Sequence, residues 1–333
     1  MFRKSLMLCA SLLFVGCDAQ TTQEDEFRDG LPSKQMVQVK EPGGSSGQRL
    51  ESDEKSGLAL GQRSDFYTFT RGATVVVNGG TAFVLNLLEE ITKHTPTSLQ
   101  GDVAVWGPHT DALSPNTWKL TVTQTGDNAY SYKLEGKGKS EADSAFKTIL
   151  SGTHSIAVDA QGNRLRDFGS GNMQLDWDAA QTLPEHDNNI GTLAIRYSRP
   201  DAQSVTTVDA NFRNVKDDER PGTRVNADYL YKETPGAGGE FDFGLSKNFD
   251  EPGSNRPGIE RLTIKSRWAQ SGAGRADVKI TGGDFGFADA RINECWDANF
   301  ASQYLEASWV TTGPVYGTVA ACGSLSTAIY SSL

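Results

Sequence analysis

Residues 225–245, with the sequence VNADYLYKETPGAGGEFDFGL, alternate apolar and polar side chains on both sides of a glycine-rich turn. Apolar residues occupy every second position from Val225 to Tyr231, and again from Phe241 to Leu245. Because successive side chains of a strand point to opposite faces, this pattern predicts two strands with one face covered and the other in water. Residues 235–239 are typical of a tight turn, so we expect an antiparallel hairpin.

The same alternation extends in both directions from this hairpin. It recurs in stretches that begin at Trp118, Tyr130, Leu193, Val208, Leu262 and Ala276. Glycine-rich turn signals separate several of these stretches, which is typical of a meander of about nine to eleven antiparallel strands. Such a sheet has one long apolar face that another element must cover.

A helical period precedes the strands. In residues 64–94, apolar side chains recur three and four positions apart, Ser64 is a suitable N-cap, and Pro96 is a stop signal. We therefore expect residues 64–333 to form a single, mainly β domain, in which a curved, half-barrel-like antiparallel meander sheet packs on one long N-terminal helix. A β-sandwich with the helix at one edge is the alternative.

The start of the chain has the features of a secretory signal peptide, which we assign to residues 1–16. Arg3 and Lys4 precede an apolar run of about ten residues, which is half the length of a membrane-spanning helix. A small residue, Gly16, stands before Cys17 at the expected cleavage site.

The tetrapeptide Phe14-Val15-Gly16-Cys17 resembles the lipobox of bacterial lipoproteins, in which the cysteine receives fatty chains such as palmitate and becomes the mature N-terminus. The resemblance implies an exported protein anchored through Cys17 to the inner or outer bacterial membrane, with its domain in the periplasm or at the cell surface. Cleavage after Ala19, which would leave Cys17 as a plain thiol, is the alternative.

The cysteine count agrees with acylation. The chain has four cysteines, of which Cys9 leaves with the signal peptide. If Cys17 is acylated, Cys295 and Cys322 remain as one pair in an oxidising compartment, so we expect a disulfide between them. Two buried free thiols are the alternative.

Residues 17–63 are rich in polar residues and glycine and poor in large apolar ones, so we expect a flexible, lipid-anchored tether there. The whole chain carries a net charge of −10 and has no cluster of Lys and Arg. A nucleic-acid partner is therefore not expected, because binding to phosphates needs such clusters.

The search for chemistry gives one weak cluster, Asp176 and Asp178 followed by Glu185, His186 and Asp187. Carboxylates and an imidazole can bind a metal or share a proton, but a polar loop explains the same residues. We expect no catalytic residues, no metal site and no cofactor, and therefore no enzyme. A hydrolase that uses the carboxylates near residues 176–187 is the alternative.

The aromatic face of the predicted sheet is the second candidate site. If the helix leaves it uncovered, it would line a pocket for an acyl chain or another apolar ligand. Its residues are Tyr130, Tyr132, Tyr229, Tyr231, Phe241, Phe243 and Trp268. The alternative is that these side chains form the core.

Two further resemblances bear on function. The helix followed by a long amphipathic sheet is similar in architecture to the half-barrel carriers of lipoproteins (the LolA and LolB type). The stretch from Ser266 through Glu294-Cys295-Trp296 to Phe300 resembles the C-terminal part of uncharacterised predicted lipoproteins of myxobacterial type. We expect a cell-envelope lipoprotein with a structural or interaction role, and a carrier or binder of lipid as the alternative.

Overall fold

The computed structural model describes residues 22–43, 59–217, 220, 222–250, 254–284, 286 and 288–333. The predicted signal peptide and Cys17 lie outside the described residues. None of the helices in the described part of the chain combines the length and the hydropathy that crossing a membrane requires.

The described strands form one antiparallel sheet in which each strand pairs with the next along the chain. The strands are β1 (Ser98–Gln100), β2 (Val103–His109), β3 (Asn116–Gly126), β4 (Ala129–Gly138), β5 (Lys147–Val158), β6 (Arg164–Asp176), β7 (Thr192–Arg199), β8 (Thr206–Lys216), β9 (Arg224–Thr234), β10 (Gly238–Lys247), β11 (Glu260–Ala269), β12 (Gly274–Gly282), β13 (Ala290–Trp296), β14 (Ser302–Ala307) and β15 (Tyr316–Gly317). The helices are α1 (Gln23–Asp29), α2 (Lys34–Val37), α3 (Asp65–Thr92) and α4 (Trp177–Ala180), with the 3-10 turns η1 (Asp143–Ala145) and η2 (Val319–Leu325).

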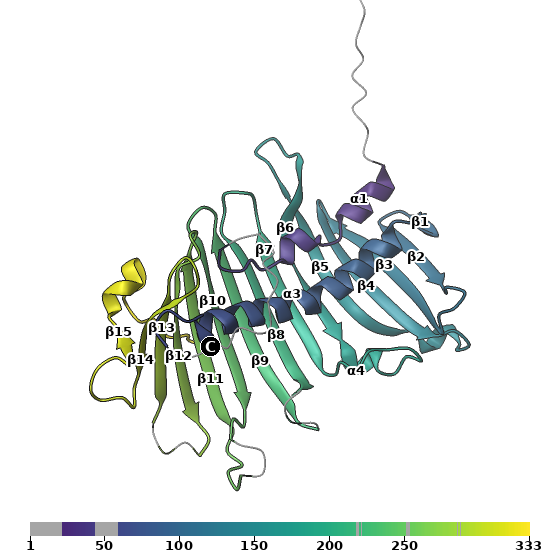
Figure 1. Cartoon of the computed structure of the whole chain (residues 1–333). Coiled ribbons are helices and arrows are strands. Elements are labelled where there is room, and N and C mark those ends of the chain that lie inside the picture. The colour runs from purple at the N-terminus through teal and green to yellow at the C-terminus, as the bar shows by residue number, and fades with distance from the viewer. Residues whose placement is uncertain are drawn as a thin grey trace, which may run out of the picture.

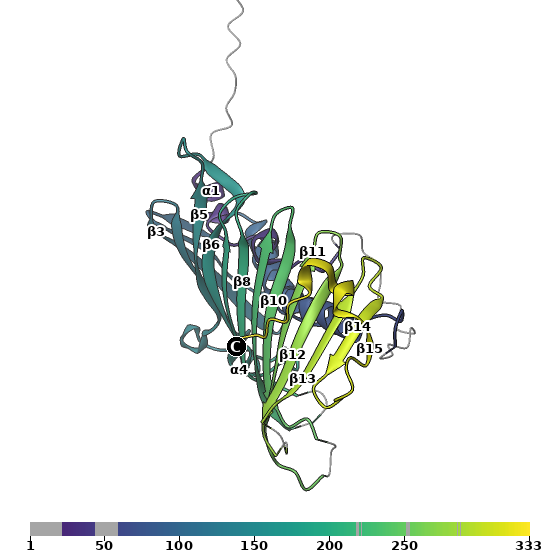
Figure 2. The ribbon, with the colours of Figure 1, turned by 90° about the vertical axis from the view of Figure 1, so that its left-hand side faces the viewer.

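This architecture confirms the predicted fold class. The sheet is an antiparallel meander of 15 strands, more than the sequence indicated, and β1 does not pair with β15, so the sheet stays open. Because all of its strands belong to one sheet, the alternative of a β-sandwich is wrong for the described chain. Figures 1 and 2 show this twisted sheet from two sides, with α3 lying across one face. We call that face the inner face.

Helix α3 crosses the sheet from β13 to β2, and both of its ends are fixed. At its start, the Ser64 hydroxyl and the Phe66 N–H donate hydrogen bonds to the Glu294 carboxylate of β13, at 2.8 and 3.0 Å. Just beyond its end, the Trp106 indole of β2 donates a hydrogen bond to the His94 carbonyl at 2.8 Å. A carboxylate at a helix N-terminus accepts the N–H groups that have no partner within the helix and favours the helix dipole.

The middle of α3 packs on the sheet through both apolar and hydroxyl side chains. The Thr70 and Ser266 hydroxyls lie 2.7 Å apart in the core, and Thr74 also donates to the Thr70 carbonyl one turn earlier. Buried polar groups are tolerated when they are hydrogen-bonded, which explains why threonines occupy the sheet-facing side of this helix.

The predicted tether is wrong for residues 22–43, which pack on the inner face beside α3. Phe27 is 1% exposed and meets the Tyr130 ring edge-on. Gly30 allows this approach, because a Cβ there would lie 2.5 Å from the Tyr130 ring. The Asn78 side-chain amide of α3 accepts from the Val39 N–H and donates to the Val39 carbonyl, both at 2.9 Å. The remainder of the predicted tether lies mostly outside the described residues.

The predicted disulfide is confirmed. Cys295 on β13 and Cys322 in η2 are bonded, with their Cα atoms 5.5 Å apart. The bond holds the C-terminal segment against the outer face of the sheet, where Arg275 donates to the Ser326 carbonyl at 2.9 Å and pairs with the buried Asp277. The alternative of two free thiols is therefore excluded.

Candidate functional site

Helix α3 is too narrow to cover the inner face. Strand β8 has 11 residues, which extend about 36 Å, whereas a helix with its side chains is about 10–12 Å across. Residues 22–43 cover the part of the face near the β5–β6 turn. On the opposite side of α3, near α4 and the ends of β6 and β8, a surface groove remains.

This groove has two neighbouring parts, with volumes of about 440 and 80 Å³, and both are lined by Trp177 and Asp187. We call the two parts together the α4-side groove. The larger part lies beside Val76 of α3, a residue that is 63% exposed. Trp177 and Phe212 form its apolar floor, with their rings stacked 6.5 Å apart. Its volume lies within the range of about 300–1,000 Å³ that is usual for small-molecule sites.

The rim of the larger part is polar, and the smaller part is mostly apolar. The exposed residues of the rim are Asp187, Asn188, Asn189 and Lys216. The smaller part is lined mainly by apolar side chains: Leu87, Trp118, Leu134, Ile149, Leu150, Leu175, Ala180 and Leu183. An apolar floor with a few polar groups at its mouth suits an amphiphilic molecule whose chain enters the groove while its polar end stays in water.

The carboxylate cluster predicted near residues 176–187 does not converge. Asp176 caps α4 by accepting from the Ala179 N–H at 2.8 Å. Asp178 accepts a hydrogen bond from the Gly191 N–H at 2.9 Å and forms an ion pair with Arg224 at 3.4 Å. Neither belongs to a group of potential metal ligands in the described part of the chain. Glu185, His186 and Asp187 instead lie at the edge of the α4-side groove.

The predicted aromatic residues lie in the core between α3, residues 22–43 and the sheet. Six of them are buried and Phe243 is partly buried: the full set is Tyr130, Tyr132, Tyr229, Tyr231, Phe241, Phe243 and Trp268. Tyr229 stacks on Phe241 with ring centres 5.1 Å apart, and Phe69 of α3 meets Phe243 edge-on at 5.3 Å. None of the seven lines the α4-side groove.

A second cavity, which we call the N-terminal cavity, lies on the other side of α3, between residues 22–43 and the β5–β6 turn. Its volume is about 530 Å³. Apolar side chains from α3 and the N-terminal segment line its interior, and charged side chains that include Asp29 and Arg166 surround them.

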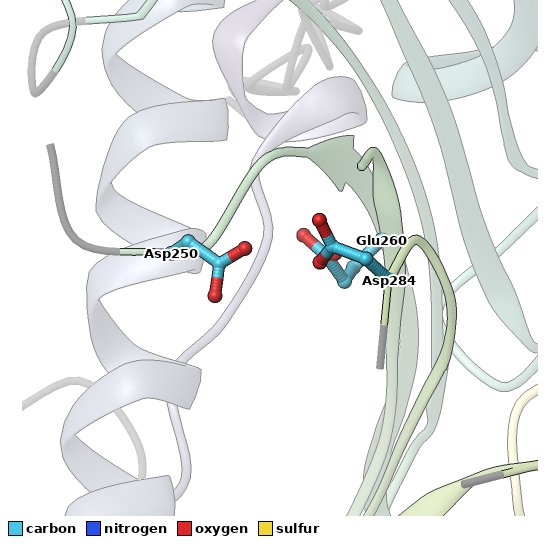
Figure 3. Close-up of side chains that lie close together, drawn as sticks. All are labelled: Asp250, Glu260 and Asp284. Carbon is cyan, nitrogen blue, oxygen red and sulfur yellow. The ribbon is translucent and has the colours of Figure 1, made fainter. Parts of the chain in front are cut away.

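Three carboxylates also gather at the turns that follow β10 and β12, as Figure 3 shows. One carboxylate oxygen from each of Asp250, Glu260 and Asp284 lies within 4.8 Å of the other two. Burial and the negative charge of Asp284 raise the pKa of Asp250. Such oxygens are the ligands that Ca²⁺ prefers, but Phe249 N–H donates to Glu260 at 2.9 Å and Arg256 lies 3.8 Å from Asp250, so protein groups already offset part of the charge.

Sequence reasoning missed the α4-side groove, the N-terminal cavity and the carboxylates of Asp250, Glu260 and Asp284, because their residues come from segments separated in the chain. Of the residues that line the groove, only Glu185, His186 and Asp187 were named as candidate site residues from the sequence, and they were named as possible metal or catalytic groups. Comparison of the chain with protein-family models, with curated proteins and with solved structures finds no match.

Proposed function

We propose that this protein is an exported lipoprotein, anchored through Cys17, that binds the acyl chain of a lipid or a similar apolar ligand in the α4-side groove. The observation that carries the proposal is the groove beside α3, with Trp177 and Phe212 on its floor and Val76 at its mouth. This is the carrier function that the sequence analysis held as an alternative.

Exposure supports a ligand there. Val76 exposes 63% of its surface at the groove, on a helix whose sheet-facing residues are buried. Apolar side chains at the mouth of a preformed concave groove lose contact with water when a chain binds, which contributes about 25 cal/mol for each Å² of apolar area buried.

The proposal is tested with phospholipids that carry bromine on the acyl chain, because bromine quenches tryptophan fluorescence on contact. The full chain with Cys17→Ser, which removes the proposed acylation site, is titrated with a short-chain brominated lipid. We expect saturable quenching, most of which disappears in Trp177→Phe. Unsaturable quenching that Trp177→Phe leaves unchanged would contradict the proposal.

A pair of neighbouring substitutions separates the groove from the helix surface. Val76→Glu places a charge at the mouth of the groove and is expected to weaken binding by about tenfold, which corresponds to about 1.4 kcal/mol. Val75→Glu changes the same residue type on the same helix but does not line the groove, so it is expected to leave the affinity unchanged. Equal losses of lipid affinity in the two variants would contradict binding in the α4-side groove.

A further inference from the structure

The N-terminal cavity has the size of a binding site and is separate from the α4-side groove. Its volume is about 530 Å³, and its walls come from residues 22–43, α3, the end of β5 and the start of β6. No residue lines both this cavity and the α4-side groove. A ligand bound here would lie on the opposite side of α3.

The interior of this cavity is apolar. Six side chains line it from residues 22–43, α3, β5 and β6: Leu31, Met36, Leu85, Leu88, Ile156 and Leu165. Most of them are buried, and Met36 adds a flexible thioether that adapts to irregular shapes. The interior therefore favours hydrocarbon.

The charged residues around this interior fall into two groups. Those of the first group already have partners: Lys34 pairs with Glu89 at 2.6 Å, and Arg28 donates to the Thr92 carbonyl at 2.7 Å. The second group is Asp29, Arg166 and Asp167, whose side chains make no hydrogen bond or ion pair with any residue that the structure describes.

The unpaired group contains both signs of charge. Asp29 and Asp167 are partly buried, whereas Arg166 is exposed. Burial raises the pKa of Asp29, while the positive charges of Arg166 and Arg164 partly oppose that rise. A partly buried carboxylate that makes no direct hydrogen bond or ion pair is unfavourable, and an ammonium that contacts Asp29 adds a direct interaction that the more distant Arg164 and Arg166 do not supply.

Charges of both signs beside an apolar interior favour a ligand that has a hydrocarbon chain and a headgroup with both a positive and a negative charge. We propose that the N-terminal cavity binds a zwitterionic amphiphile, whose primary ammonium contacts Asp29 and Asp167, whose phosphate contacts Arg166, and whose chain lies on Leu85, Leu88 and Ile156. An ethanolamine phospholipid has this chemistry. The inference rests on the proposed lipid-binding function, but it concerns a second site.

Binding is measured by titration calorimetry on the full chain with Cys17→Ser and Val76→Glu, so that the α4-side groove contributes little. The probes are short-chain phosphatidylethanolamine, phosphatidylglycerol with the same chains, and glycerophosphoethanolamine, which has the headgroup without chains. We expect phosphatidylethanolamine to bind about tenfold more tightly than either of the others, a difference that one charge-assisted contact can supply.

Three substitutions and one control assign the contacts. Asp29→Asn and Asp167→Asn are expected to remove the preference for phosphatidylethanolamine over phosphatidylglycerol, and Arg166→Gln to weaken both lipids. Asp111→Asn is the matched control, because Asp111 is exposed and lies in neither cavity. Circular dichroism spectra of all variants are compared to verify that they are folded.

The outcomes separate this inference from the proposed function. Equal affinity for the two lipids, unchanged in Asp29→Asn, would overturn the zwitterion site and leave the α4-side groove untouched. Equal affinity for glycerophosphoethanolamine and phosphatidylethanolamine would show that the headgroup binds alone, which overturns the amphiphile. Loss of the proposed function is read separately, from the brominated-lipid titration of the chain with Val76 intact.

Discussion

Acid is expected to destabilise this protein through one histidine. His154, on β5, is completely buried, and its Nδ1 lies 2.8 Å from the Tyr197 hydroxyl oxygen. Burial lowers the pKa of His154 from its ordinary value of 6.5 to about 4. The folded protein therefore keeps this imidazole neutral in a pH range where the unfolded chain protonates it.

The sign and size of the effect follow from proton linkage. Between pH 6.5 and 4 the unfolded chain binds a proton at His154 that the folded chain does not bind, so stability falls as the pH falls. The contribution is complete above pH 6.5 and is lost as the pH approaches 4. At about 1.4 kcal/mol for each pH unit, the loss amounts to about 3 kcal/mol.

The assay is urea unfolding, followed by tryptophan fluorescence at pH 7 and pH 4. His154→Gln removes the titrating group, so the difference in unfolding free energy between the two pH values is expected to shrink by about 3 kcal/mol relative to the wild type. His109→Gln is the control, because His109 is exposed on the surface. If His154→Gln kept the full pH dependence of the wild type, the buried, neutral state of His154 would be refuted.

Three other perturbations test the anchoring of the helix and of both ends of the described chain. Glu294→Ala leaves the Ser64 hydroxyl and the Phe66 N–H without their acceptor, so it is expected to lower the unfolding free energy by about 1–3 kcal/mol in urea unfolding. An unchanged unfolding free energy would show that Glu294 does not stabilise the start of α3. Replacing Cys295 and Cys322 with serine is expected to cost about 3 kcal/mol, because the disulfide closes a loop across a sequence separation of 27 residues, and an unchanged thermal midpoint would contradict this. Asn78→Ala removes both hydrogen bonds to Val39 and is expected to speed amide hydrogen exchange in residues 34–40 while β9 and β10 stay protected; uniform exchange rates would disprove the local role of Asn78.

The meander could be predicted from the sequence wherever bulky apolar residues alternate with polar ones, as in β9 and β10. Strands β5 and β6 gave a weaker signal because glycines occupy inner-face positions there. A Cβ at Gly152 would lie 2.4 Å from the Tyr132 hydroxyl, and one at Gly171 would lie 2.6 Å from the Tyr197 hydroxyl. These glycines leave room for rings from the neighbouring strand, so their role depends on pairing that a single sequence does not display.

The packing of residues 22–43 could not be predicted for a different reason. Their apolar side chains are separated by charged and polar residues, and the segment as a whole has the composition of a disordered tether. A local signal was present nonetheless, since Thr22 and Asp25 form a capping box at the start of α1. The groups that receive Phe27 and Val39, the Tyr130 ring of β4 and the Asn78 side chain of α3, come from distant parts of the chain.

The candidate site was the least predictable part. The α4-side groove combines Val76 of α3, Trp177 of α4 and Phe212 of β8, whose spacing in the sequence carries no period. The seven aromatic residues proposed as a pocket lie on the inner face, where α3 and the N-terminal segment bury most of them. Sequence alternation identifies which face is covered, whereas the width of the covering helix decides where a groove remains.

The most direct test of lipid binding in the α4-side groove is a quantitative lipid analysis of the protein purified from the membranes of its own host. The wild type and Val75→Glu are expected to carry a similar amount of non-covalently bound lipid for each protein chain, and Val76→Glu is expected to carry clearly less. A wild type without bound lipid, or a Val76→Glu protein that retains the full amount, would contradict lipid binding in the α4-side groove.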